Sequence, residues 1–122
     1  MVQAQTMKKI KLPNGEEVVD ISKDWDTLME FYGSMSQWGN YENVSKITIN
    51  GNSFIGVRKK LTNWYSEGSE AFRGELDKYG IKNLKLKASG GTYNLKGQIS
   101  EDGDTIIMDD GSSLKFTLTR KR

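Results

Sequence analysis

Residues 83–120 read NLKLKASGGTYNLKGQISEDGDTIIMDDGSSLKFTLTR, and this stretch decides the fold. Apolar and polar side chains alternate along it, as at Leu84, Lys85, Leu86 and Lys87. Alternation with period two over several successive runs is typical of antiparallel strands with one buried face. The intervening Ser-Gly-Gly and Asp-Gly steps supply residues that tolerate positive φ, as tight hairpins require. The stretch therefore predicts four short strands joined by three glycine turns.

Two further hairpins are predicted upstream, around the turns Pro13-Asn14-Gly15 and Asn50-Gly51-Asn52. An Asn-Gly step between two alternating runs is the strongest short-range hairpin signal. About eight strands result, which is enough for a small closed barrel. Their predicted ranges are 8–12, 16–19, 44–50, 53–60, 82–88, 92–100, 104–109 and 112–120.

Two short helices are predicted between these strands. Ser22 is placed to cap the first, and Gly33 to end it. Its apolar stripe, at i, i+3, i+4 and i+7, consists of Trp25, Leu28, Met29 and Tyr32. The second is expected between 61 and 80, ending at Gly80. Its stripe consists of Phe72, Leu76 and Tyr79.

The predicted fold class is α+β with predominantly antiparallel β structure: a meander or a small, barrel-like sheet of about eight strands with two short helices. With 122 residues, the chain is expected to form one domain, 1–122, with residues 1–7 frayed. The outline resembles that of lipocalin-type barrels. Their Gly-x-Trp motif at the first strand is absent, since Trp38-Gly39 does not match it, and no family is assigned.

The chain contains no cysteine and no histidine. Disulfides, thiolate nucleophiles and cysteine-ligated metal sites are therefore excluded. The absence of histidine removes Ser-His-Asp chemistry and histidine general bases. Carboxylates, lysine, tyrosine and arginine remain available for catalysis, but a protein without enzymatic activity and without a cofactor is expected.

Carboxylates cluster at Glu101-Asp102-Gly103-Asp104 and at Asp109-Asp110. Their spacing does not match the calcium-binding loop of an EF-hand. Asp-Gly steps are sufficient to explain them as turns, and the two turns should lie at opposite ends of one strand. No metal site is predicted.

Large aromatic residues outside the regular alternation are the leading candidates for a binding site. These are Trp38, Tyr41 and Trp64. A large ring in a loop either plugs the end of a sheet or contacts a partner. The leading hypothesis is a small binding or interaction module that contacts an unknown protein or a small apolar ligand. An alternative is a small β-barrel carrier of a hydrophobic ligand.

A second alternative is an anion or nucleic-acid binder with a lysine-bearing sheet face. The candidates, assigned to the polar phase of their strands, are Lys85, Lys87, Lys96, Lys115 and Arg120. The cluster Arg58-Lys59-Lys60 is a further candidate anion contact, although such clusters are commonly a solvated strand end. Tyr93 and Phe116 lie in the opposite phase, so the lysine face lacks stacking platforms and nucleic acid is not favoured.

No apolar run approaches the ~20 residues that a membrane-spanning helix needs. The N-terminal sequence MVQAQTMKKIKL also lacks the apolar core of a secretory signal. We therefore expect a soluble protein, cytoplasmic or otherwise intracellular, that is a monomer or a homodimer.

Overall fold

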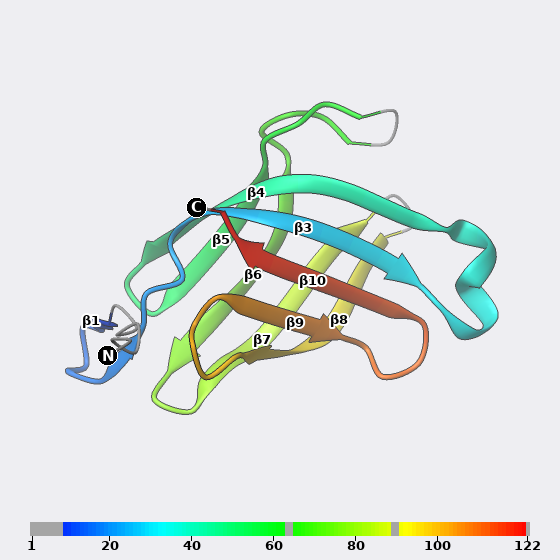
Figure 1. Cartoon of the computed structure of the whole chain (residues 1–122). Helices are drawn as coiled ribbons and strands as arrows, with labels where there is room; N and C mark the ends of the chain where they lie inside the picture. The colour runs from blue at the N-terminus through cyan, green and yellow to red at the C-terminus, as the bar shows by residue number, and fades with distance from the viewer. Residues whose placement is uncertain (1–8, 63–64, 89–90, 122) are drawn as a thin grey trace, which may run out of the picture.

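A computed structural model describes residues 9–62, 65–88 and 91–121, without the side chain of Trp38. Eight antiparallel strands form a closed barrel in the order β10-β3-β4-β5-β6-β7-β8-β9 (Figure 1). Neighbours follow one another in sequence except where β10 pairs with β3 and closes the barrel. The strands are β3 (Lys23–Phe31), β4 (Asn40–Asn50), β5 (Ser53–Arg58), β6 (Glu70–Asp77), β7 (Gly80–Ala88), β8 (Gly91–Ile99), β9 (Thr105–Asp109) and β10 (Leu114–Arg120).

Two other elements lie outside the barrel strands. A separate two-stranded sheet consists of β1 (Lys9–Lys11) and β2 (Glu17–Val19). A short 3-10 helix, η1 (Gly33–Trp38), connects β3 to β4. The helical structure in the described residues is too short to cross a membrane.

The first predicted helix is wrong, because its residues form β3. Trp25, Thr27 and Met29 alternate along this strand and are buried inside the barrel. Leu28, which the helical pattern placed beside Trp25 and Met29, belongs to the opposite phase and is half-buried. The helical spacing was therefore coincidental: it combined residues from both faces of a strand.

The second predicted helix is also wrong, because residues 70–77 form β6. Phe72, Gly74 and Leu76 alternate toward the barrel interior. Gly74 lies opposite Phe54 on β5, and a Cβ atom there would lie 2.8 Å from the Phe54 ring. In the same way, Gly56 of β5 lies opposite Phe72. Because glycine has no Cβ atom, Gly56 and Gly74 allow the aromatic ring on the neighbouring strand to approach the backbone closely.

The prediction of a mostly antiparallel sheet of about eight strands is confirmed, and of the two predicted forms, meander or barrel, the structure has the closed barrel. The strands that form the barrel differ from those predicted. The predicted strands 8–12 and 16–19 correspond to the separate sheet of β1 and β2. Their places in the barrel are taken by the two segments predicted as helices. The correct total therefore arose from two compensating errors.

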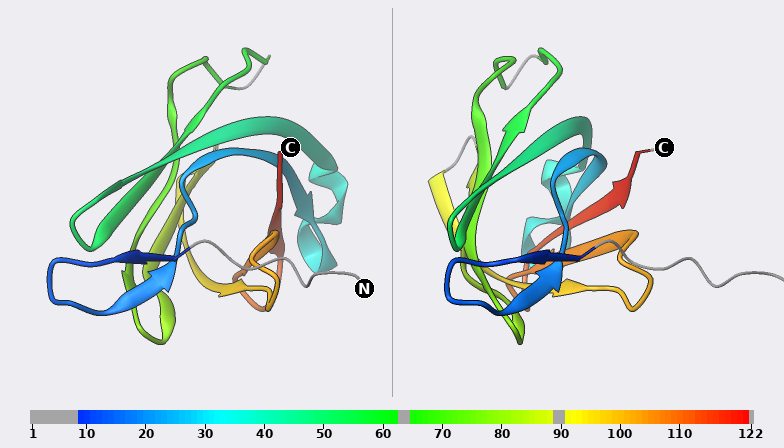
Figure 2. Two further views of the ribbon diagram at one scale, coloured as in Figure 1. Left: turned by 60° about the vertical axis from the view of Figure 1, so that its left-hand side comes forward. Right: turned by 90° about the vertical axis from the view of Figure 1, so that its left-hand side faces the viewer.

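One end of the barrel is closed by the segment that precedes β3. The hairpin of β1 and β2 lies at this end (Figure 2), and Leu12, Val18 and Ile21 are buried in the hydrophobic core. The indole Nε1 of Trp25 donates a hydrogen bond to the carbonyl of Ile21 at 2.9 Å. The buried tryptophan thus connects the barrel interior to the chain that covers it.

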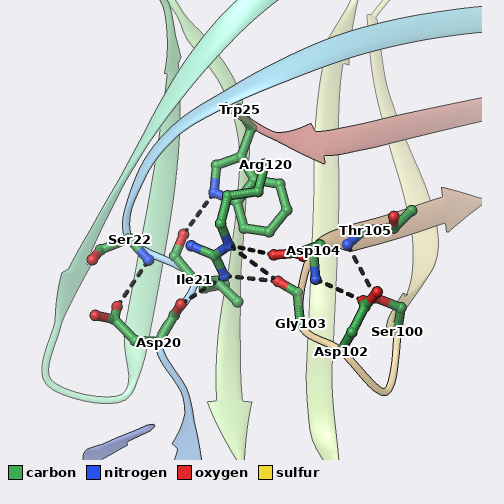
Figure 3. Close-up of polar contacts among 10 residues, drawn as sticks. All are labelled: Asp20, Ile21, Ser22, Trp25, Ser100, Asp102, Gly103, Asp104, Thr105 and Arg120. Atoms are coloured by element: carbon green, nitrogen blue, oxygen red, sulfur yellow. Dashed lines mark hydrogen bonds and ion pairs between the residues drawn. The ribbon is translucent and has the colours of Figure 1, made fainter. Parts of the chain in front are cut away.

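Arg120 lies over Trp25 at the same closed end (Figure 3). Its guanidinium carbon is 4.4 Å from the centroid of the tryptophan ring. The guanidinium also donates hydrogen bonds to the carbonyls of Gly103 and Asp20 and forms an ion pair with Asp104. Through these contacts, Arg120 connects the end of β10 to the segment before β3 and to the turn between β8 and β9.

The opposite end of the barrel contains η1 and the turn between β9 and β10. Tyr32 joins the two, because its hydroxyl donates to Asp109 at 2.7 Å and its backbone N–H donates to the carbonyl of Ser113 at 2.9 Å. The hydrogen bond to Asp109, with burial and the charges of Asp109 and Asp110, raises the pKa of Tyr32 to about 12.

Candidate functional site: the barrel-mouth pocket

A cavity of about 190 Å³ lies in the barrel at the end that contains η1. We call it the barrel-mouth pocket. An apolar cavity of about 150 Å³ can hold benzene, so this volume accommodates a molecule with one ring. The lining residues are Thr27, Met29, Asn40, Tyr41, Glu42, Asn43, Ser45, Arg58, Thr62, Tyr65 and Phe116. Asn40 and Glu42 are exposed, so the pocket reaches solvent at its rim.

One row of the lining is apolar and runs across three neighbouring strands. Phe116 of β10 lies opposite Met29 of β3, and Met29 lies opposite Tyr41 of β4. Met29 and Phe116 are buried, and Tyr41 packs against the core. These side chains form a wall suited to the apolar body of a ligand.

A second row carries polar side chains. Ser45 of β4 lies between Trp25 of β3 and Arg58 of β5 in the strand pairing. Both Ser45 and Arg58 belong to the inward phase of their strands, and their exposed fractions are 0% and 6%. A serine, an arginine and the buried Thr27 of β3 therefore line a cavity inside a largely apolar barrel.

Arg58 is held by backbone and hydroxyl oxygens. Its guanidinium donates to the carbonyl of Glu70 at 2.7 Å, to the hydroxyl of Ser69 at 3.3 Å and to the carbonyl of Lys87. Its guanidinium carbon is 3.9 Å from the centroid of the Tyr65 ring, a cation–π contact. Within the described residues, Arg58 forms no ion pair with a carboxylate. Burial lowers the pKa of Arg58, while Tyr65 and Glu70 act in the opposite direction.

Glu70, the acidic residue beside Arg58, is engaged with other cations. Its carboxylate accepts hydrogen bonds from Arg73, and it lies 3.5 Å from the Lys87 ammonium. The hydrogen bond from Arg73 is the largest of the effects that lower the pKa of Glu70, and burial opposes them. The negative charge of Glu70 is therefore shared between two cations, Arg73 and Lys87.

Ser45 is completely buried, and its hydroxyl has no hydrogen-bond partner among the described residues. Burying a hydroxyl without a partner costs about 1–3 kcal/mol in proteins. Buried polar groups are usually satisfied, so an exception that lines a cavity invites a functional explanation. A ligand oxygen in the pocket would provide the missing partner.

The connection between β5 and β6 is positioned by Asn43. The Asn43 side-chain amide donates to the carbonyl of Lys60 at 3.2 Å, and the amide oxygen accepts from the Lys60 N–H at 3.1 Å. Farther along, the Tyr65 N–H donates to the Thr62 hydroxyl at 3.0 Å. These contacts hold Thr62 and Tyr65 at the rim of the pocket.

Of the three predicted aromatic candidates, Tyr41 lines the barrel-mouth pocket. Its ring also makes an edge-to-face contact with Phe31, with centroids 6.2 Å apart. Trp38 ends η1, but its side chain lies outside the described part of the structure. Trp64 also lies outside the described residues.

Lys85, Lys87 and Lys96 are exposed on the outer face of the barrel, and Lys115 is half-buried there. Acidic residues interrupt this face. Asp109 lies opposite both Lys96 and Lys115 in the strand pairing. The lysines therefore do not form a continuous cationic surface.

The assignment of Arg120 to the outer lysine face is wrong. Leu114, Phe116 and Leu118 define the inward phase of β10, and Arg120 continues it. Its guanidinium lies over Trp25 at the closed end, whereas Lys115 belongs to the outward phase. Lys115 and Arg120 are an odd number of positions apart on β10, so strand alternation alone would have assigned them to opposite faces.

The sequence prediction of a binding site missed Ser45 and undervalued Arg58. Arg58 was grouped with its exposed neighbours Lys59 and Lys60, but it follows Phe54 and Gly56 in the inward phase. Ser45 lies in the same phase as Ile47. A polar residue in the apolar phase of a predicted strand is the signal that identifies both positions.

The aspartate clusters form turns at opposite ends of β9, as predicted. Asp102 accepts hydrogen bonds from the Ser100 hydroxyl and the Asp104 N–H, and Asp110 organises the turn before β10. The described residues include no group of three acidic side chains arranged to hold a metal ion.

Comparisons of the chain with protein-family models, with curated proteins and with solved structures find no match.

Proposed function

We propose that the protein is a non-enzymatic binding protein and that its barrel-mouth pocket holds a small ligand of about one ring in size. The observation that carries this proposal is the cavity of about 190 Å³ whose lining includes three buried polar side chains, Thr27, Ser45 and Arg58. Small-molecule sites commonly combine apolar walls with a few placed polar groups. The row of Phe116, Met29 and Tyr41 supplies such a wall.

This proposal refines the hypothesis of a binding module with aromatic contacts, because Tyr41 is one of the pocket residues. It also favours the barrel carrier over the nucleic-acid binder. The outer lysines alternate with acids such as Asp109, which weakens attraction for a phosphate backbone. The pocket, in contrast, contains a buried cation.

The test is a titration of the isotope-labelled protein with small one-ring compounds, followed by amide NMR shifts. We expect the shifts to concentrate at Met29, Tyr41, Ser45 and Arg58. Ser45→Leu adds bulk to the pocket and should abolish them. Thr48→Leu is the matched control, because Thr48 is exposed on the same strand. Shifts that persist in Ser45→Leu, or that fall on the outer lysines, would overturn the proposal.

A further inference from the structure

We infer that the ligand is a small organic anion, whose charged group binds Arg58 and Ser45 while its apolar body lies against Met29, Tyr41 and Phe116. This inference rests on the proposed function, since it names the chemical class that the barrel-mouth pocket accepts. It follows from the charge, the unused hydrogen-bonding capacity and the size of the pocket.

The charge of Arg58 is the first argument. The exposed fraction of Arg58 is 6%, and in the described residues no carboxylate forms an ion pair with its guanidinium. Buried charges in proteins are usually paired with an opposite charge, because an uncompensated one is costly. Glu70 is close, but its carboxylate binds Arg73 and Lys87. An anion in the pocket would supply the missing counter-charge.

The hydrogen-bonding capacity of the site is the second argument. A guanidinium has five N–H donors, and three hydrogen bonds from Arg58 go to protein oxygens. The Ser45 hydroxyl, directly opposite Arg58 in the strand pairing, has no described partner and can donate. A carboxylate accepts several hydrogen bonds at once and suits the planar guanidinium.

The shape of the pocket is the third argument. The apolar row of Phe116, Met29 and Tyr41 and the polar pair line the same cavity, and the row of Thr27 and Asn43 lies between them in the strand pairing. A ligand that reaches across the Thr27 position can contact both. The volume of about 190 Å³ limits the ligand to about one ring with its charged substituent. Glu42 at the exposed rim adds a negative charge that keeps the anionic group toward Arg58 rather than toward the opening.

The experiment compares three probes of nearly equal size: benzoate, benzamide and benzylamine, which is protonated at neutral pH. Amide NMR titration gives a dissociation constant and a location for each. We expect benzoate to bind in the pocket at least about tenfold more tightly than benzamide, because charge-assisted hydrogen bonds are the stronger ones. Benzylamine should bind most weakly.

The outcomes separate the two proposals. If benzamide binds in the pocket as tightly as benzoate, or benzylamine binds more tightly, the anion inference is overturned while the proposed function stands. If none of the three shifts the pocket resonances up to its solubility limit, both are overturned. The comparison uses the native chain, so it does not depend on the folding of a variant.

Variants then assign the anchor residues. Arg58→Met should remove the preference for benzoate, because the carboxylate loses its cationic partner. The dissociation constant of benzoate should then be within about threefold of that of benzamide, or weaker than it. Arg73→Met is the matched control, because Arg73 is an exposed arginine that contacts the same Glu70, and it should keep the preference. Retention of the preference in Arg58→Met would overturn the assignment.

Ser45→Ala provides a milder test if Arg58→Met does not fold. Loss of one hydrogen bond should weaken benzoate about two- to tenfold. Benzamide should weaken less, because its contact with the hydroxyl is not charge-assisted. An unchanged ratio of the two constants would contradict the role of the hydroxyl as second anchor.

Discussion

Ser45 and Arg58 lie directly opposite each other in the antiparallel pairing of β4 with β5, and both side chains are buried inside the barrel. Each carries a polar group that an apolar core would exclude. The cavity beside them has an apolar wall on neighbouring strands. A site for a small anion explains both residues with one ligand, and the predictions below test the features of the fold that create this site.

Ser45→Ala should stabilise the ligand-free protein by about 1 kcal/mol. The substitution removes a buried hydroxyl that has no described partner, so the cost of burying it disappears. Urea denaturation followed by tryptophan fluorescence measures the change. Thr48→Ala, at an exposed position of the same strand, should produce no comparable gain. Destabilisation by Ser45→Ala would mean that the hydroxyl makes a stabilising hydrogen bond.

Lys23→Gly should stabilise the protein by about 0.5–1 kcal/mol. Lys23 begins the first barrel strand with a φ of 82°, a conformation that glycine adopts more readily.

The control is Lys46→Gly, in an exposed position within β4. It should destabilise the protein by about 0.5–1 kcal/mol, because glycine weakens an ordinary strand. Thermal unfolding followed by circular dichroism compares the two variants. If both substitutions lower the melting temperature equally, the conformation assigned to Lys23 is incorrect.

Gly56→Ala should destabilise the barrel by about 1–3 kcal/mol, because the added methyl group would overlap the ring of Phe72. The same methyl should be tolerated better when the ring is removed. In a double-mutant cycle with Phe72→Leu, the two losses should therefore be less than additive. Chemical denaturation of the single and double variants provides the four free energies. Strict additivity would show that Gly56 and Phe72 are not in contact.

Asp110 should contribute stability that is lost in acid. Burial tends to raise its pKa, but hydrogen bonds from the backbone of Ser112, Ser113 and Leu114 and from the Ser113 hydroxyl outweigh it and lower the pKa to about 2. Because the folded pKa lies below the ordinary value of 3.8, the stabilisation is complete above about pH 4. It disappears as the pH falls toward 2.

Asp110→Asn should therefore lower the free energy of unfolding at pH 7 by about 1–2 kcal/mol. The free energy of unfolding of this variant should also fall less steeply than that of the native protein as the pH is lowered from 4 to 2. Asp102→Asn is a useful comparison, since Asp102 organises the turn at the other end of β9. Denaturation curves across this pH range measure both variants. An unchanged slope in Asp110→Asn would contradict the lowered pKa.

Local alternation and glycine turns were sufficient to predict the meander of β7 to β10 and the hairpin of β4 and β5. They failed at β3, where Trp25, Leu28 and Met29 match helical spacing even though Trp25 and Met29 also alternate with Thr27. Closure of the barrel depends on the pairing of β10 with β3, which lie far apart in the sequence. No local pattern reports such a contact.

The functional site was only partly predictable for the same reason. Tyr41 was identified because it is a large aromatic outside a clear alternation. Arg58 and Ser45 become neighbours only through strand pairing, and the unused hydroxyl of Ser45 is visible only when its surroundings are known. The inward phase of each residue can be read from its own strand, but the cavity between strands cannot.

The most direct test of the central claim is a crystal structure of the protein with benzoate. We predict that the benzoate ring lies in the barrel-mouth pocket against Met29, Tyr41 and Phe116. Its carboxylate should lie within hydrogen-bonding distance of the Arg58 guanidinium and the Ser45 hydroxyl. A structure with benzoate bound only to the outer lysines, or with side chains filling the pocket, would contradict the account.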